Sequence, residues 1–204
     1  MPRPLAFDRD KAIEVAMQEI WRHGYRAASV KALSEKLGIT RSSFYNAFGS
    51  RETLFQLALR RYLTEIPSGR LFSLDRDTPL KPALTEIFRA LCACRGRDIA
   101  QRGCMVSNAI AEMLPGDDDA ACLVLKLSMD TIDRIEELVT WAIERGELDE
   151  TDPRVLAICT QNLMIGINMQ SKFGLSGETL WATAKRTLQG LGLYASLAES
   201  NVEP

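Results

Sequence analysis

The most informative segment of the chain covers residues 29–55 and reads SVKALSEKLGITRSSFYNAFGSRETLF. Ser29 is a favourable N-cap for a short amphipathic helix that ends at Gly38. Thr40 is a favourable N-cap for a second short helix, which carries an aromatic pair. Two short helices joined by Gly-Ile-Thr have the spacing of a helix-turn-helix, which we place at about residues 29–48.

Helical patterns flank this motif on both sides. Apolar residues recur at helical spacing over about residues 8–24 and again over about 51–66, after the N-cap residue Ser50. A stretch with three prolines, residues 67–82, is interpreted as a connector. Beyond it, the pattern predicts five more helices, at about residues 80–97, 102–114, 118–146, 152–174 and 176–197.

No segment alternates between apolar and polar residues as a strand would, so the expected fold class is all-α, with about nine helices. We expect two domains. The first, residues 1–66, is a three-helix domain built around the helix-turn-helix, and the second, residues 67–204, is a larger helical domain.

The composition excludes several classes of protein. The chain has 204 residues, of which 46% are hydrophobic and 25% charged, as in ordinary globular proteins. Its single histidine, His23, makes a multi-histidine metal site impossible and leaves little scope for triad catalysis, so we expect no catalytic residues, metal or cofactor. The N-terminus has no apolar signal and no window is long enough to span a bilayer, which favours a cytoplasmic protein without membrane contact.

The charge is unevenly distributed along the chain. Residues 1–66 hold 11 Lys/Arg and 7 Asp/Glu, a balance of +4, while residues 67–204 hold 14 and 20, a balance of -6. A small basic head on a larger acidic body indicates that the head meets a polyanion. The alternative is a chance asymmetry in a surface that binds nothing.

Residues 8–66 resemble the TetR family of transcriptional repressors. The most specific part is Phe44-Tyr45-Asn46-Ala47-Phe48, followed by Ser50-Arg51-Glu52 and Leu54. Family members typically have lysine where Arg51 stands, and often have larger residues where Asn46 and Ala47 stand. The resemblance implies a homodimer that binds a double-stranded DNA operator and responds to a small-molecule inducer. It also implies that the last two long helices pair with their symmetry mates in a four-helix bundle.

The helix that begins at Thr40 would place its N-terminal side chains at base edges in a major groove. Arg41 could bond a guanine bidentately, while Tyr45 and Arg51 suit phosphate contacts. The alternatives are a solvated face for the two arginines and a core role for Tyr45. The candidate DNA-binding residues are Ser29, Lys31, Thr40, Arg41, Ser42, Ser43, Tyr45, Asn46 and Arg51.

A second candidate site lies in the body. Gly103-Cys104 at a helix start, and the segment that ends at Lys172, resemble the electrophile- and oxidant-sensing branch of the family, which includes the N-ethylmaleimide reductase repressor. A thiol in the first turn of a helix beside Arg102 has its thiolate favoured, so Cys104, Asn108 and Lys172 are the candidate sensing residues. The alternative is that Cys104 is a small buried hydrophobe and Lys172 a solvated side chain.

The other cysteines carry weaker signals. Cys92 and Cys94 lack the spacing of a zinc site or a redox pair, and Cys122 and Cys159 lie in apolar runs, where we expect core positions.

Taken together, the sequence predicts a ligand- or redox-responsive transcriptional regulator, a repressor that binds a palindromic operator as a dimer. Two alternatives remain: a helical protein-interaction adaptor without DNA binding, and a helical enzyme. Duplex binding that weakens steeply with salt separates the regulator from both.

Overall fold

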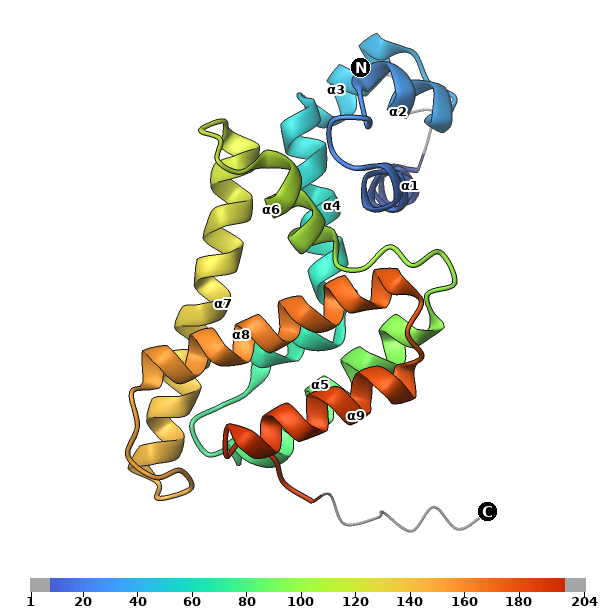
Figure 1. The fold of residues 1–204 in the computed structure, drawn as a ribbon. Helices are drawn as coiled ribbons and strands as arrows, with labels where there is room; N and C mark the ends of the chain where they lie inside the picture. Colours follow the sequence, from blue (N-terminus) through green and yellow to red (C-terminus); the bar gives the residue numbers. More distant parts are fainter. Residues whose placement is uncertain (1–7, 197–204) are drawn as a thin grey trace. The chain divides into compact units, whose positions relative to one another are not determined.

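The computed structural model describes residues 8–196, which form nine α-helices and two short 3-10 helices, without any strand (Figure 1). The all-α prediction is therefore confirmed. The α-helices are α1 Arg9–His23, α2 Val30–Leu37, α3 Arg41–Phe48, α4 Arg51–Glu65, α5 Leu80–Arg97, α6 Met105–Met113, α7 Asp119–Glu144, α8 Pro153–Gln170 and α9 Gly177–Gly190; the 3-10 helices are η1 Pro67–Ser73 and η2 Ser171–Phe173.

Local sequence signals set most of these helix ends. The hydroxyl of Ser29 accepts a hydrogen bond from the N–H of Ala32, and that of Ser176 accepts one from the N–H of Thr179. The carboxylate of Asp152 likewise caps α8 by accepting from two N–H groups of its first turn. These are the residue types that satisfy the unpaired donors of a helix start.

Two segments differ from the sequence-based expectation. The predicted connector, residues 67–82, contains the 3-10 helix η1. The last helix ends at Gly190 rather than at 197, because Gly192 adopts a left-handed φ of 71° that an α-helix does not continue through. Residue 197 itself lies outside the described residues.

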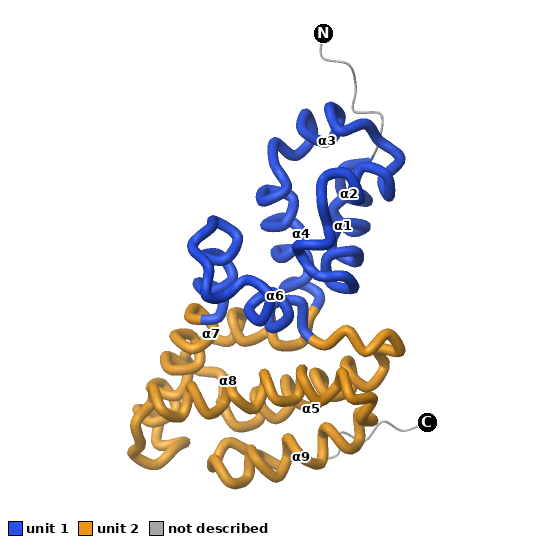
Figure 2. Tube along the Cα trace, turned by 45° about the horizontal axis from the view of Figure 1, so that its top comes forward, with its two compact units in different colours: residues 1–65, 104–128 blue, residues 66–103, 129–204 orange. Residues whose placement is uncertain are grey.

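The described chain divides into two compact units (Figure 2). The first contains residues 8–65 and 104–128, and the second contains residues 66–103 and 129–196. From the sequence alone, residues 104–128 are expected in the second domain. They join the first unit because α6 packs against α1 and α4.

Several of the largest side chains in the core of the first unit are aromatic. Phe44 on α3, Phe55 and Tyr62 on α4 and Met17 on α1 are almost completely buried. The rings of Phe44 and Phe48 lie with their centroids 5.4 Å apart, so α3 is anchored by one face. The opposite face of α3 is left at the surface.

The core of the second unit lies chiefly between α5 and α9, which run side by side (Figures 1 and 2). Leu84 and Phe88 on α5 and Leu180 and Leu188 on α9 are buried, and residues of α7 and α8 pack around them. The two helices approach so closely that a Cβ at Gly96 would lie 2.4 Å from the backbone nitrogen of Gly177. This crossing therefore requires glycine.

Candidate nucleic-acid interface

Helix α3 has two faces of different character. Phe44 and Phe48 point into the core, while Tyr45 is 51% exposed and Arg41 and Asn46 are also exposed. The exposed residues of α3 are Arg41, Ser42, Tyr45 and Asn46, whose spacing puts them on one side of the helix. This is the geometry of a helix that is packed on one side and able to contact a partner with the other.

The side chain of Thr40 caps the N-terminus of α3. The Thr40 hydroxyl accepts a hydrogen bond from the Ser43 N–H at 3.1 Å. The same oxygen lies 2.9 Å from the hydroxyls of Ser42 and Ser43. Thr40, Ser42 and Ser43 therefore form one hydroxyl cluster at the helix N-terminus, beside the exposed Arg41.

The turn before α3 is made as the sequence predicts. Gly38 ends α2 with a left-handed φ of 65°, and the Ile39 N–H donates to the Ser34 carbonyl at 3.0 Å. On α2, Ser29 is committed to capping, whereas Lys31 is exposed and forms a solvated ion pair with Glu35 at 4.0 Å.

Arg51, at the start of α4, lies against an aromatic ring. Its guanidinium carbon sits 4.0 Å from the centroid of the Tyr25 ring, and its Nε lies 3.7 Å from a carboxylate oxygen of Glu52. The side chain keeps 29% of its surface exposed. A cation held over a ring in this way is positioned rather than freely solvated.

Tyr25 and Glu52 complete this arrangement. The Tyr25 hydroxyl donates to the Glu52 carboxylate at 3.1 Å. Burial raises the pKa of Tyr25 above its ordinary value, against the opposing effect of Arg51. Hydrogen bonding to its own backbone N–H is the main influence that holds the pKa of Glu52 below its ordinary value. At neutral pH the phenol is therefore the donor and the carboxylate the acceptor.

Sequence reasoning missed Glu112 on α6. Its two carboxylate oxygens accept from the N–H groups of Tyr25 at 2.9 Å and Arg26 at 2.6 Å, in the loop between α1 and α2. Gly24, with a φ of 85°, leaves room for this contact, since a Cβ there would lie 2.7 Å from Glu112. No local pattern pairs a glutamate with a loop 86 residues away, so only Gly24 hinted at a close approach.

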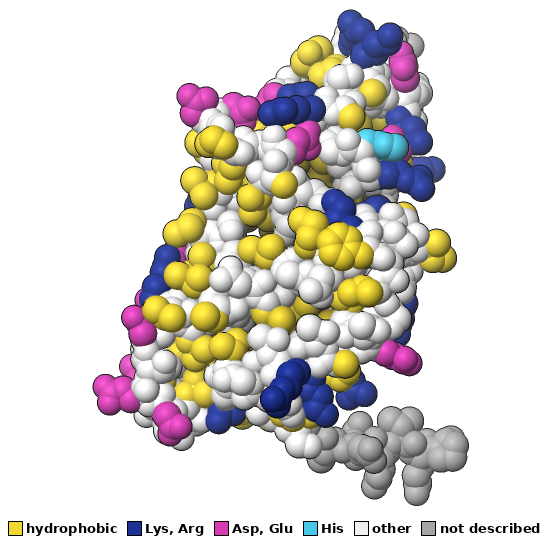
Figure 3. Space-filling model, viewed as in Figure 1, with side chains coloured by type: hydrophobic (Ala, Val, Ile, Leu, Met, Phe, Trp, Pro, Cys, Tyr) yellow, Lys and Arg dark blue, Asp and Glu magenta, His cyan; other side chains and the backbone are white. Residues whose placement is uncertain are grey.

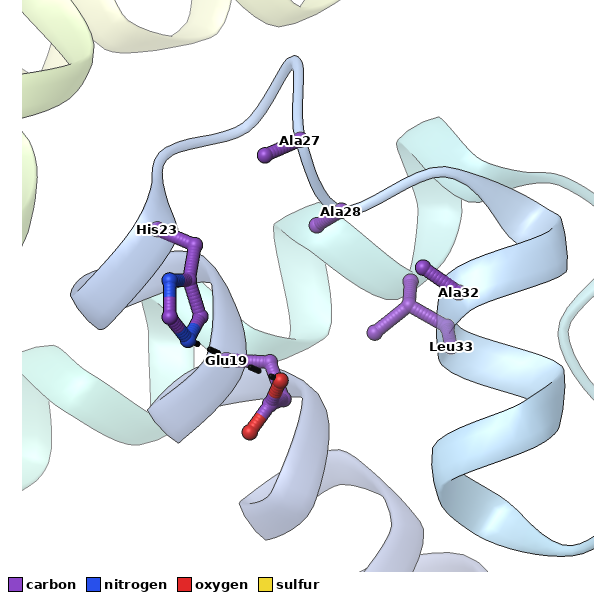
Figure 4. Close-up of a pocket in the computed structure, with 6 residues that line it drawn as sticks. All are labelled: Glu19, His23, Ala27, Ala28, Ala32 and Leu33. Atoms are coloured by element: carbon purple, nitrogen blue, oxygen red, sulfur yellow. Dashed lines mark ion pairs between the residues drawn. The ribbon is translucent and has the colours of Figure 1, made fainter.

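On the face shown in Figure 3, Lys and Arg side chains lie over the upper part, where Figure 1 draws α1, α2 and α3, and also near the lower end, and Asp and Glu side chains lie among those of the upper part. A shallow cavity of about 270 Å³ lies in the same unit, lined by residues of α1, of α2 and of the loop between them (Figure 4). Its polar lining is the ion pair of Glu19 with His23, at 4.0 Å. The remaining lining residues are Ala27, Ala28, Ala32 and Leu33, a set that offers no acid-base chemistry.

Of the candidate sensing residues, Lys172 lies beside Gly103, the residue that precedes Cys104, since a Cβ at Gly103 would lie 3.1 Å from a side-chain carbon of Lys172. Cys104 is the N-cap residue of α6, is 7% exposed and makes no capping hydrogen bond. It belongs to the first unit, with the partly buried Asn108, whereas the exposed Lys172 belongs to the second. Arg102 donates hydrogen bonds to the Asp98 carboxylate from its Nε at 3.1 Å and from its backbone N–H at 2.8 Å. The charge of its guanidinium is therefore already balanced by Asp98.

The remaining cysteines correct one expectation. All five cysteines are free thiols. Cys92 is buried, but Cys122 is exposed, with its sulfur 3.7 Å from the Asp117 carbonyl. Placing Cys122 in the core was wrong, because its apolar run lies on an amphipathic helix that buries only one face.

Within residues 8–196, no group of three or more His, Cys, Asp and Glu side chains has the arrangement of a metal site. The same residues include no helix with the length and hydropathy needed to cross a membrane.

The fold and this surface define an all-α helix-turn-helix regulator. Two family models match the chain: "Bacterial regulatory proteins, tetR family" over residues 12–58 and "Tetracyclin repressor-like, C-terminal domain" over residues 81–187. The chain belongs to the TetR family and is a transcriptional regulator, not an enzyme.

Individual relatives agree. The chain is 28% identical to the HTH-type transcriptional repressor ComR of Escherichia coli K12, over 92% of this chain and 90% of ComR. It is 33% identical to BdcR, another repressor of that organism, over 58% of this chain and 60% of BdcR. A cysteine mutant of the TetR family regulator CifR, complexed with a 26-base-pair operator, has a similar structure. It shares 33% identity over 92% of this chain and 98% of CifR, with a TM-score of 0.79.

Proposed function

We propose that the protein is a repressor that binds a palindromic operator as a homodimer, with α3 in the major groove of each half-site. The observation that carries this proposal is the two-faced α3, whose aromatic side is buried and whose polar side is exposed. The similarity to CifR, which was solved with operator DNA, supports it. The protein would act in the cytoplasm, on DNA, without membrane contact.

We assign two roles to the exposed residues of α3 and of the adjoining helix ends: base recognition and phosphate contact. Arg41 would read a base, because a guanidinium can donate two hydrogen bonds to guanine. Tyr45 on α3 and Arg51 at the start of α4 would contact phosphates. Ser29, the N-cap residue of α2, and Lys31 on α2 would add contacts to the DNA backbone. Thr40, Ser42, Ser43 and Asn46 supply the small polar groups that permit close approach.

A stripe along α8 supports the dimer. Val155, Ile158, Ile165 and Met169 are between 38% and 56% exposed, although all are apolar. With Asn162 they follow steps of three and four residues, the pattern of a helix seam that packs against another helix. The same stripe on a second copy would cover it about a two-fold axis, with α9 alongside in a four-helix bundle.

We assign DNA binding to residues 1–66 and dimerisation and inducer response to residues 67–204. Release would follow from a reversible small molecule or from modification of Cys104 by an electrophile, with Asn108 and Lys172 contributing. The position of Cys104 supports the second route, because it is the N-cap residue of α6, which packs against α1 and α4 of the helix-turn-helix unit.

The test uses operator duplex selected from random DNA, with binding followed by fluorescence anisotropy over a series of salt concentrations. Arg41→Ala should lower the discrimination between operator and random duplex by about 1–3 kcal/mol. Arg51→Ala should weaken both duplexes alike and make the salt slope shallower by about one unit.

Arg89→Ala, which removes an exposed arginine from the other unit, is the matched control and should change neither quantity. Equal losses on both duplexes for Arg41→Ala would contradict the assigned base contact. A wild-type protein that binds no duplex would favour the adaptor alternative.

A further inference from the structure

We propose that Glu112 on α6 is a positioning residue for operator binding, which acts through Tyr25 on the guanidinium of Arg51. This inference rests on the proposed function, since it assigns to Glu112 control over a side chain that contacts the DNA backbone. All the residues concerned lie in one compact unit.

The first step is the hydrogen bonding of Glu112 to the loop between α1 and α2. Each carboxylate oxygen accepts from one backbone N–H, that of Tyr25 at 2.9 Å and that of Arg26 at 2.6 Å. Hydrogen bonds to an ionised carboxylate are shorter and stronger than neutral ones. Gly24 brings the loop so close that no other residue could replace it without displacing the carboxylate.

The second step runs from the Tyr25 backbone to its side chain. Tyr25 is 4% exposed, and its ring lies 4.6 Å from that of Phe55 on α4. Its hydroxyl is bonded to Glu52, and the guanidinium of Arg51 lies over the ring at 4.0 Å. A close-packed ring cannot follow a moving loop without shifting the groups packed on it, so the place of Arg51 depends on the place of the loop.

The third step is the helix that carries Glu112. The chain enters this unit at residue 104, and α6 follows directly. A helix of nine residues is a rigid rod about 13 Å long, so a displacement at its first residue reaches Glu112 near its other end. Helix α6 is thereby coupled to a DNA-contacting arginine through named hydrogen bonds and one aromatic ring.

The competing explanation is that Glu112 only stabilises the loop. The two explanations predict opposite changes in operator affinity and different changes in the salt slope. Removing a negative charge from a DNA-binding unit would by itself tighten binding to a polyanion. Loss of the positioning role instead weakens binding and removes one phosphate contact from the salt slope.

The experiment compares wild type with Glu112→Gln in operator titrations over a range of KCl concentrations. Glutamine keeps the size of the side chain but offers a donor where one N–H needs an acceptor. We expect operator affinity to fall about tenfold and the salt slope to become shallower by about one unit. In an Arg51→Ala background, Glu112→Gln should cause no further loss, because the two changes act on one contact.

Glu65→Gln is the matched control. Glu65 is an exposed glutamate of the same unit whose side chain bonds Arg61 at 2.6 Å, so the substitution removes the same charge and should leave the salt slope unchanged. Thermal unfolding and stoichiometric titration give the folded, active fraction of each variant. If Glu112→Gln fails to fold, Tyr25→Leu takes its place: it removes the ring beneath Arg51 but keeps both backbone N–H groups, and should also make the slope shallower.

A wild-type salt slope in Glu112→Gln, or in Tyr25→Leu when that variant takes its place, would overturn this inference alone. So would a loss that adds to that of Arg51→Ala. Wild-type protein without any duplex binding would overturn the proposed function as well, so the two failures are distinguishable.

Discussion

The five free thiols of the chain lie in different surroundings. Burial raises the pKa of the Cys92 thiol to about 12, so this residue stays protonated at neutral pH and is a poor nucleophile. Cys122 is exposed on α7. Cys104 is only 7% exposed but stands at the N-cap position of α6, where a covalent adduct would disturb the packing of a whole helix.

The residue-level prediction concerns alkylation by N-ethylmaleimide, followed by peptide mass spectrometry and operator binding. Cys122 should react readily without effect on DNA, and Cys92 should stay unmodified. Modification of Cys104 should release operator, because the adduct cannot fit a buried site. Cys104→Ser should bind operator and ignore the reagent, since a hydroxyl supplies no thiolate.

Cys122→Ser is the matched control, and it should respond like wild type. Lys172→Ala should alter the response to a mild oxidant more than that to the maleimide, because an amine matters only for capturing an oxidised sulfur. Release that persists in Cys104→Ser would show the sensor hypothesis to be wrong and leave the reversible ligand.

At the scale of elements, the start of α5 shows how a distant residue replaces a local cap. Its N-cap position is Pro79, which offers no side-chain acceptor. Glu147 serves instead, accepting from the N–H groups of Leu80 at 2.8 Å and Lys81 at 2.7 Å. Burial alone would raise the pKa of Glu147, but these N–H groups and Arg145 outweigh it and hold the pKa below its ordinary value.

We expect Glu147→Gln to lower the free energy of unfolding by about 1–2 kcal/mol at neutral pH, the usual cost of a lost cap. Because the folded pKa is depressed, the contribution of Glu147 is fully present above the ordinary value of 4.5 and is lost as the pH falls through the folded pKa. Urea titrations at several pH values check this. The difference in the free energy of unfolding between wild type and Glu147→Gln should disappear at acidic pH.

Glu144→Gln removes an exposed carboxylate paired with Arg76 and should cost less than about 1 kcal/mol. A gap for Glu147→Gln that stays constant with pH would contradict the role of its ionised form.

At the scale of the whole molecule, the apolar stripe on α8 is the surface that we propose pairs with a second copy of the chain. Four apolar side chains at seam spacing, Val155, Ile158, Ile165 and Met169, stay exposed in one chain. Contiguous exposed apolar surface of this kind marks an interface. Two-fold pairing would also set the separation of the two α3 helices, and thereby the spacing of the operator half-sites.

Replacing Ile158 and Ile165 together by glutamate should therefore produce a monomer in sedimentation experiments, because the substitution buries charges facing their own copies. Operator affinity should fall toward that for random duplex, by on the order of a thousandfold. The control is Ile99→Glu, which adds a charge at a position that is 97% exposed and outside α8, and should leave the dimer intact. A dimeric double variant would place the interface elsewhere.

The sequence alone determined the features that depend on neighbours a few residues apart. Caps such as Ser29 and Thr40, and stops such as Gly38, bounded the helices because each bond they make lies within one turn. Thr40 as N-cap placed Arg41 and Ser42 at the exposed start of α3, on the face that we propose binds DNA. The motif within residues 29–55 indicated the TetR family, which the family models confirm.

Only the tertiary structure decided which distant residues meet. Glu112 accepts hydrogen bonds from the loop after Gly24, and Glu147 accepts them from the start of α5. Both sets of bonds join residues more than 60 positions apart. The packing of residues 104–128 with the first unit is of the same kind. Helical periodicity states which side of a helix is buried but not what covers it, because the same apolar face fits many neighbours. A carboxylate that bonds backbone N–H groups leaves no mark in its partner's sequence, since every residue but proline carries the same donor.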